Sequence, residues 1–529
     1  QLIKGGFESK FGGRLSSVTE ITSKEGNQKR FNIGGDLSLL SANLYTEGPV
    51  AKNMTGFLAF RRSYQGPVYD YISEKFGKRS LTTDAAPMGE GPGGRFTQNA
   101  DIKSFFYDLN GKLTWTPGNN NIVSLSLYNG TDKLDNGFDA ATPSFGQRNA
   151  NFSMNSTDLT RYGNIGGSLK WGKKWSPKVY GNTILSYSNY YSNRDRSQER
   201  TTFNEDMAAV TTRTGVFENN DLRDYSLKSD YQWDMFNISK LQFGAYATWF
   251  DIKYSYAQSD TATILDRYDY GMLAGGYVQN EFKLLKDKLR ILPGIRSSYY
   301  QITGDNYLEP RLSASFSITD NLSVKAATGK YYQFANRVTR EDIMSGSKDF
   351  WILADGYNIP VSSAVHYTAG LSYETPVYLF SGEVYYKTID NLTEHSLRIN
   401  ASPMGVNYNE NFFTGYGYSK GIELLAQKKY GDFNGWLSYT LGEAMNHFDE
   451  YSDGYFPANQ DVRHEFKIVG LYNLRRFDFS ANWIFATGRP YTSPSGAYSI
   501  DLLGGSSRDF FTVTEKNCLR LPEIGRAHV

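Results

Sequence analysis

The clearest pattern along this chain is a strict alternation of apolar and polar residues. Between residues 311 and 318 every second residue is apolar, and the residues between them are Arg or Ser. Residues 123–127 and 477–483 alternate in the same way. Successive side chains of a β-strand point to opposite faces of the sheet, so each run is predicted to be a strand with one apolar and one polar face.

The connections between the predicted strands are alternately short and long. Short turn signals stand near residues 117–120, 176–177, 235–239, 286–287, 319–321, 375–376, 430–431 and 474–476. Long polar stretches lie near residues 65–104, 132–161, 193–221, 255–271, 335–363, 389–417, 444–463 and 488–516. Counting from Asp36 gives about eighteen strands of roughly ten residues or more, the length that crosses a bilayer. So many long loops are improbable in a compact soluble domain, and we therefore predict an all-β fold, a transmembrane antiparallel β-barrel.

Composition narrows the classes further. The chain has 529 residues, of which 15% are aromatic, and a net charge of +1. This near-neutral balance disfavours binding to nucleic acid through phosphate neutralisation. The aromatic residues cluster at strand ends, as at Tyr190 and Trp249, where a membrane-interface girdle would place them. No run approaches the ~18 apolar residues of a membrane-spanning helix. With one cysteine, Cys518, and five histidines without ligand spacing, neither a metal nor a cofactor is predicted.

Two local motifs suggest other chemistry. Residues 89–94 match the dinucleotide-binding glycine pattern, but no strand precedes them and no helix follows, which indicates a polar loop. Residues 417–421 match the nucleophile elbow of hydrolases, and Asp461 and His464 follow in the hydrolase order. Residues 422–429 lack a helical stripe, yet a secreted serine hydrolase using Ser419 stays open as an alternative. The acidic residues within 449–461 do not follow the EF-hand spacing; a solvated loop is the favoured interpretation, and a loose surface calcium site is the alternative.

Six motifs in a consistent order resemble those of one family. They lie at residues 11–18, 47–49 with 60–64, 309–312 with 329–333, 417–424, 456–464 and 486–492. In these segments the chain resembles a TonB-dependent outer-membrane receptor. The resemblance implies a barrel of about 22 strands closed by an N-terminal plug. It also implies a location in the cell outer membrane, as a multi-pass barrel in contact with lipid.

The resemblance divides the chain into three parts. Residues 1–30 are interpreted as the C-terminal remnant of the plug domain, 31–522 as a β-barrel incomplete at its C-terminus, and 523–529 as a non-native tail that fits no strand. The implied function is active import of a scarce extracellular nutrient, a small molecule, glycan or siderophore. The energy would come from the TonB complex, which would bind a plug segment that this sequence lacks. A passive porin or an adhesin-type barrel is the alternative, although a porin does not need the plug remnant.

Two groups of residues are candidates for function. Substrate recognition is expected in the long loops, where aromatic rings either stack on a ligand or pack loop against loop. Strand parity points the second group into the lumen, where they contact the plug and water or relay substrate. The loop candidates are Phe350, Trp351, Tyr357, Phe412, Phe413 and Tyr416. The lumen candidates are Arg290, Arg296, Arg311, Lys325, Asp478 and Asn482.

Overall fold

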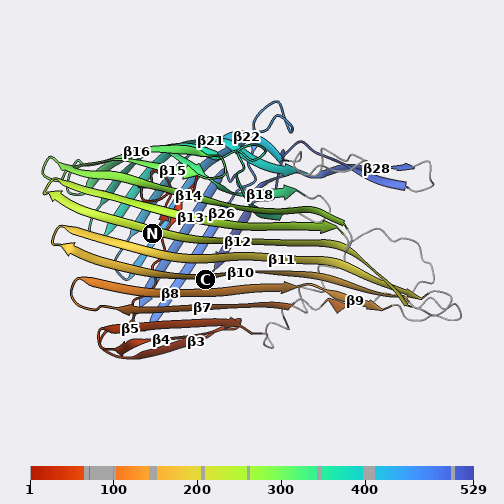
Figure 1. Cartoon of the computed structure of the whole chain (residues 1–529), viewed down its shortest axis with the longest axis horizontal. Coiled ribbons are helices and arrows are strands. Elements are labelled where there is room, and N and C mark those ends of the chain that lie inside the picture. Colours follow the sequence, from red (N-terminus) through yellow and green to blue (C-terminus); the bar gives the residue numbers. More distant parts are fainter. Residues whose placement is uncertain are drawn as a thin grey trace. The chain divides into compact units, whose positions relative to one another are not determined.

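The computed structural model describes residues 2–64, 71, 99–100, 103–141, 152–203, 209–258, 262–341, 348–396, 412–501 and 507–528. The glycine motif at 89–94 lies outside these ranges. The elements follow one another as β-strands (Figure 1). Within the described ranges, no helix has the length and hydropathy needed to cross a bilayer. Contacts divide the chain into two units, residues 1–21, 230–245 and 273–529, and residues 22–229 and 246–272. We call them unit 1 and unit 2.

Unit 2 contains an antiparallel sheet in which each strand pairs with the next long strand along the chain. The outermost strand in sequence is β3, and the pairing then runs through β4, β5, β7, β8, β10 and β11. In Figure 1 these strands run side by side. Their bounds are β3 Asn32–Leu37, β4 Ser41–Ala51, β5 Met54–Ser63, β7 Lys103–Trp115, β8 Asn121–Asp135, β10 Phe152–Ser176 and β11 Val179–Phe203. Parts of β12 (Ala209–Phe236), β13 (Ser239–Gln258) and β14 (Ala262–Leu284) also belong to unit 2.

Unit 1 has the same meander of antiparallel pairs. It starts from the second half of β14 and runs through β15, β16, β17, β20, β21, β22, β23, β25 and β26. The bounds are β15 Leu289–Tyr300, β16 Asp305–Ser317, β17 Leu322–Gln333, β20 Ser362–Glu374, β21 Tyr378–Ser396, β22 Phe412–Lys428, β23 Phe433–His447, β25 His464–Leu474 and β26 Phe477–Ala486. A hairpin of β18 (Ala335–Glu341) and β19 (Lys348–Leu353) stands between β17 and β20.

The strand and turn predictions are confirmed. Eighteen described strands have ten residues or more, and every predicted short turn joins two of them. One of these turns, at residues 285–288 between β14 and β15, has three successive residues with positive φ, Leu285, Lys286 and Asp287. Such a turn reverses the chain within a few residues and fixes the register of the two strands that it joins.

Several predicted long loops contain strand residues, and the difference is clearest in two of them. Residues 193–221 contain the end of β11 and the start of β12, and residues 255–271 contain the end of β13 and the start of β14. These strands are 20 to 28 residues long, about twice the length that a bilayer requires. Their outer parts have polar residues on both faces, so the apolar alternation that identifies a membrane strand disappears while the hydrogen-bonded ladder continues.

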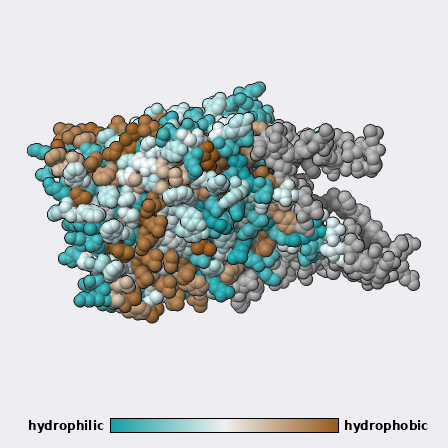
Figure 2. Space-filling model, in the orientation of Figure 1, coloured by the Kyte–Doolittle hydropathy of each residue, from teal (hydrophilic) through white to brown (hydrophobic). Residues whose placement is uncertain are grey.

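The apolar face of the sheet is the exposed face. In β16, Leu312 is 46% exposed and Phe316 is 40% exposed, whereas Arg311, which precedes Leu312 and points to the opposite face, is 7% exposed. Figure 2 shows apolar surface gathered over β5, β7 and β8 in unit 2. This distribution is the reverse of that in a soluble sheet and fits a sheet with lipid on its outer side.

The largest group of fully buried apolar side chains lies in residues 334–361 of unit 1. This segment includes the β18–β19 hairpin and the turn after it. Phe334, Val338, Phe350, Ile352, Leu353 and Ile359 are each at most 1% exposed. The described residues of the predicted loop, 335–341 and 348–363, therefore form a packed element.

The C-terminal residues also differ from the prediction. Residues 523–529 are predicted to fit no strand, yet β31 (Ile524–His528) pairs antiparallel with β26, with Ala486 opposite Ile524. An edge strand offers free backbone donors and acceptors to any extended segment, whatever its side chains. The pairing therefore does not depend on an alternating pattern.

Candidate functional site

In unit 1 one row of residues crosses six neighbouring strands on the same face of the sheet. Opposed positions in the register place Gln279, Gly294, Arg311, Gly329, His366 and Lys387 side by side, on β14, β15, β16, β17, β20 and β21. We call these six residues the anchor row. Directly opposed residues of antiparallel strands share a face, so the four long side chains project to one side.

The anchor row holds the first residues of the chain. We call residues 4–16 the N-terminal segment. Its ends are brought together by pairing of β1 (Leu2–Ile3) with β2 (Val18–Thr19), which makes the segment a closed loop. Lys387 Nζ binds both of its ends, donating to the carbonyl oxygens of Lys4 at 2.8 Å and Ser16 at 3.2 Å. The base of the loop therefore lies at β21.

The tip of the loop reaches the other end of the row. The backbone N–H of Ser9 donates to Gln279 Oε1 at 2.7 Å. Arg311 Nη1 donates to the carbonyl oxygens of Glu8 at 2.5 Å and Phe11 at 2.6 Å. Near the C-terminal end of the segment, His366 Nε2 donates to the carbonyl oxygen of Leu15 at 2.7 Å. Most of these bonds end on main-chain carbonyl oxygens, so the row recognises the path of the segment more than its side chains.

A buried charge cluster supports the tip. Glu309 is fully buried and lies between Arg296 (5% exposed) and Arg311. Its carboxylate accepts a hydrogen bond from Arg311 Nη2 at 2.5 Å and lies 3.5 Å from Arg296 Nε. Ser298 Oγ donates to the same carboxylate at 3.2 Å. Arg296 Nη1 in turn donates to the carbonyl oxygen of Ser9 at 3.2 Å. One carboxylate thus pairs with and orients two guanidinium groups that bind the segment, and buried cations are costly without such a partner.

Aromatic rings enclose the Arg311 guanidinium group. Its central carbon lies 5.0 Å from the Phe7 ring centroid and 4.5 Å from that of Tyr331. Tyr331 also packs on His366, with ring centroids 4.4 Å apart. The Tyr331 hydroxyl and His366 Nδ1 have no hydrogen-bond partner among the described residues. An unsatisfied buried polar group destabilises the folded state by about 1–3 kcal/mol, so these two groups offset part of the stability that the charged and aromatic contacts contribute.

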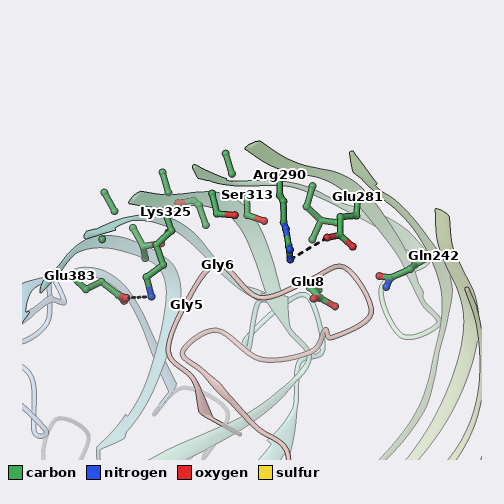
Figure 3. A pocket seen from close by; sticks show the side chains of 17 residues that line it. Gly5, Gly6, Glu8, Gln242, Glu281, Arg290, Ser313, Lys325 and Glu383 are labelled. Carbon is green, nitrogen blue, oxygen red and sulfur yellow. Dashed lines mark hydrogen bonds and ion pairs between the residues drawn. The ribbon is translucent and has the colours of Figure 1, made fainter. Parts of the chain in front are cut away.

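A second row, made of charged residues, lies beside the anchor row on the same face of the sheet. Arg290 and Lys325 are followed across the strands by Glu383 and Glu423, again on opposed positions. Lys325 Nζ lies 3.1 Å from Glu383, and Lys4 Nζ pairs with Glu423. Figure 3 shows Arg290 and Lys325 beside Gly5, Gly6 and Glu8, around a cavity of ≈ 340 Å³.

The lumen candidates therefore take three positions. Arg296 and Arg311 bind the N-terminal segment, and Arg290 and Lys325 line the cavity beside it. Asn482 lies opposite Val469, which lies opposite Trp436, a residue that lines another cavity together with Ile3 and Lys4. Asp478 is four residues before Asn482 on the same strand and shares its face. Sequence reasoning missed Gln279, Glu309, His366 and Lys387 as site residues, and only Glu309 stood in a recognised motif.

The loop candidates divide by exposure. Phe350, Phe412 and Phe413 are buried, and Phe413 packs with Phe448 and Phe456. These three therefore pack loop against loop in this structure. Tyr357 is 89% exposed and Tyr416 is 44% exposed, so each presents a ring to solvent. Trp351 is half-buried, and its ring lies 5.9 Å from the Arg14 guanidinium carbon.

The geometry does not assemble the hydrolase site considered above. No helix follows Ser419, because β22 continues to Lys428. Ser419 lies opposite Lys387, on the face of the anchor row. His464 lies opposite Leu441, which lies opposite Ile422, on the other face of β22. A serine and a histidine on opposite faces of one sheet cannot share a proton. Among the described residues, no group of three or more His, Cys, Asp or Glu is placed to hold a metal ion.

Comparison with known proteins agrees with this arrangement. The family model described as TonB dependent receptor-like, beta-barrel matches residues 25–514. The chain belongs to the TonB-dependent receptor family. Its fold is accordingly the antiparallel β-barrel of these receptors, as predicted, and the segment-facing side of the sheet is the barrel's lumen side. No curated protein matches the chain by sequence.

Several solved TonB-dependent receptors share the fold at low identity. The ferripyoverdine receptor of Pseudomonas aeruginosa bound to ferripyoverdine has a TM-score of 0.61 at 10% identity, covering 98% of this chain and 67% of that one. The receptor FpvA of P. aeruginosa with a heterologous pyoverdine has a TM-score of 0.58 at 10% identity, covering 92% and 63%. A mutant ferric enterobactin receptor of P. aeruginosa in complex with enterobactin has a TM-score of 0.55 at 12% identity, covering 95% and 80%. Of these three relatives' own lengths, this chain covers between 63% and 80%, so it spans only part of each.

Proposed function

We propose that this chain forms the barrel and the last part of the plug of an outer-membrane receptor that imports a scarce extracellular nutrient with energy from TonB. The anchor row is the observation that carries the proposal. A passive porin needs an open lumen and gains nothing from four buried or partly buried side chains bound to the backbone of one segment. A receptor whose plug must stay bound to the barrel wall and then be released needs a set of contacts such as the anchor row.

The geometry of the loop supports release by pulling. Its closed base is held by the β1–β2 pairing, by Lys387 and by the Lys4–Glu423 ion pair, while its tip is held by Arg296 and Arg311. A force applied at the base loads these contacts in succession. Each hydrogen bond to a charged group stabilises by about 1.5–3 kcal/mol, so sequential breaking meets several small barriers instead of one large barrier.

We place ligand contacts on the exposed loop rings. Tyr357 stands on a turn in which Asp355 Oδ1 accepts hydrogen bonds from the backbone N–H groups of Tyr357 at 2.9 Å and Ile359 at 2.8 Å. Gly356, with φ of 77°, completes the turn. A ring held on a rigid turn loses little conformational entropy on binding. The structural neighbours were solved with ferripyoverdine, pyoverdine and enterobactin, so ferric siderophores are the first ligand class to test.

The test is uptake by cells that express the receptor from its complete gene. We expect saturable accumulation of one labelled ligand from a panel of ferric siderophores, glycans, peptides and cobalamin, and we expect that deletion of TonB abolishes it. Non-saturable accumulation of many small solutes in cells without TonB would instead support the porin alternative.

Replacing Tyr357 with alanine should weaken ligand binding about tenfold, the effect of losing one central aromatic contact. The control is Tyr430→Ala, because Tyr430 is also exposed (68%) but lies in the short turn between β22 and β23. Isothermal titration of both variants with the imported ligand measures the difference. Equal affinities for the two variants and the parent would remove Tyr357 from the ligand site.

A further inference from the structure

On β10 a lysine side chain lies between two tryptophan rings. Lys173 Nζ is 3.9 Å from the ring centroid of Trp175 and 5.6 Å from that of Trp171. The two rings are 6.1 Å apart and meet edge to face. Trp171 is also fixed by a hydrogen bond from its Nε1 to Asn121 Oδ1 at 3.3 Å. We propose that Lys173, held in place by these two rings, binds the phosphate group of a glycerophospholipid in the periplasmic leaflet of the outer membrane.

The register places the three side chains on the lipid side of the sheet. Lys112 is on the opposite face, where its Nζ donates to the carbonyl oxygen of Ser23. Lys112 lies opposite Ser126, which lies opposite Ser168, so even-numbered positions of this part of β10 face inward. The odd-numbered positions Trp171 and Lys173 face outward, because the register of β10 is unbroken from residue 152 to residue 174. Trp175 stands at the irregularity that follows, and its ring contacts both of them on this side.

The position along the strand is that of a lipid headgroup. Lys173 and Trp175 stand just before the two-residue turn that joins β10 and β11. In barrels of this kind the short turns lie on the periplasmic side, and aromatic rings mark the height of the headgroups. The ammonium group is therefore at the level of the phosphates of that leaflet.

The charge at this level is unbalanced. Lys173 makes no ion pair with any residue that the structure describes. The positions opposite it are Asn121 on β8 and Gly181 on β11, and neither carries a charge. A cation–π contact with an exposed ring contributes only about 0.5–1 kcal/mol and covers one side of the ammonium group, which leaves its other hydrogens for an anionic oxygen.

An apolar track continues from this headgroup site toward the bilayer centre. Leu125, Leu169 and Leu185 lie opposite one another on β8, β10 and β11, four residues from Lys173, and are 41%, 46% and 56% exposed. At about 3.3 Å per residue this row is roughly 13 Å from the lysine. Beyond it, Gly167 lies between Leu127, which is 56% exposed, and Tyr187, so the apolar surface continues along the same face. Acyl chains of a lipid held at Lys173 would follow this track.

The chain provides a matched control one residue away. Lys174 has the same charge and the same strand, but its side chain faces inward. The receptor, expressed from its complete gene and delipidated in mild detergent, is titrated with phosphatidylglycerol and, separately, with a diacylglycerol of the same chains. Binding is read by native mass spectrometry. Heat-modifiable migration on gels checks that each variant is folded.

Lys173→Gln should weaken phosphatidylglycerol binding roughly fivefold, the effect of one lysine near an anionic surface. Lys173→Arg should retain binding, and Lys174→Gln should leave it within about twofold of the parent. Diacylglycerol, which lacks the phosphate, should bind all variants equally weakly. Equal losses in Lys173→Gln and Lys174→Gln, no loss in either, or diacylglycerol binding as tight as that of phosphatidylglycerol would each overturn the proposal.

Discussion

Replacing Glu309 with glutamine should destabilise the receptor by about 3–5 kcal/mol. Glu309 is fully buried and is the carboxylate that bonds to Arg311 and lies against Arg296. Without its negative charge, two guanidinium groups remain buried together with no counter-ion, and the strands β15 and β16 must accommodate their repulsion. The free energy of unfolding in urea, measured for the receptor refolded in lipid vesicles, gives the loss directly.

The matched control for this change is Glu383→Gln. Glu383 belongs to the same sheet face and also pairs with a cation, Lys325, but the lysine side chain is 60% exposed and the glutamate side chain is 26% exposed. Water screens such a pair, so its removal should change the free energy of unfolding by less than about 1 kcal/mol. If both variants lose the same amount of stability, the buried cluster is not the distinct structural element described above.

The strands could be predicted because the bilayer imposes a simple pattern. Lipid on one side and the lumen on the other force the alternation seen at 311–318, and tight reversal forces turn residues such as Lys286 and Asp287. Where β11 and β12 extend past the length that crosses a bilayer, both faces of the strand are polar and the alternation disappears, although the backbone hydrogen-bond ladder continues. The sequence predicts the part of each strand that meets lipid and misses the part that does not.

The site was predictable only in part, for a related reason. Parity on one strand shows that Arg296 and Arg311 face the lumen. It does not show that Gln279, His366 and Lys387 stand level with Arg311, because that depends on the register of five successive strand pairs. A shift of one residue in any pair would break the row. No local motif encodes this alignment.

The loop aromatic residues show another limit. Phe350 and Tyr357 stand in the same segment, and both are typical of a binding platform. Phe350 is fully buried and Tyr357 is 89% exposed, because the β18–β19 hairpin packs its own core. Composition cannot distinguish a ring that builds a loop from a ring that the loop presents.

A substitution at Gly6 tests whether the N-terminal segment is held in place by its contact with the barrel wall. A Cβ on Gly6 would stand 2.4 Å from the Cβ of Ala327, and the residue has φ of 62°. Gly6→Ala should therefore lift the segment away from the anchor row. Gly13→Ala is the control, because Gly13 also has positive φ (72°) while a Cβ there meets no described atom within 4 Å. Both variants incur the backbone penalty of about 1–2 kcal/mol, and only Gly6→Ala adds a steric clash.

The readout is labelling of a cysteine at the buried tip. In a Cys518→Ser background, Ser9→Cys places a thiol at a position that is 1% exposed in the parent. Its reaction with a polar maleimide should be roughly 5- to 150-fold faster in Gly6→Ala than in Gly13→Ala, since a clash of about 1–3 kcal/mol shifts the open population by that factor. Adding Ala327→Gly to Gly6→Ala removes the opposing Cβ and should restore slow labelling. Fast labelling that persists in this double variant would show that backbone conformation, and not the contact with the wall, holds the segment in place.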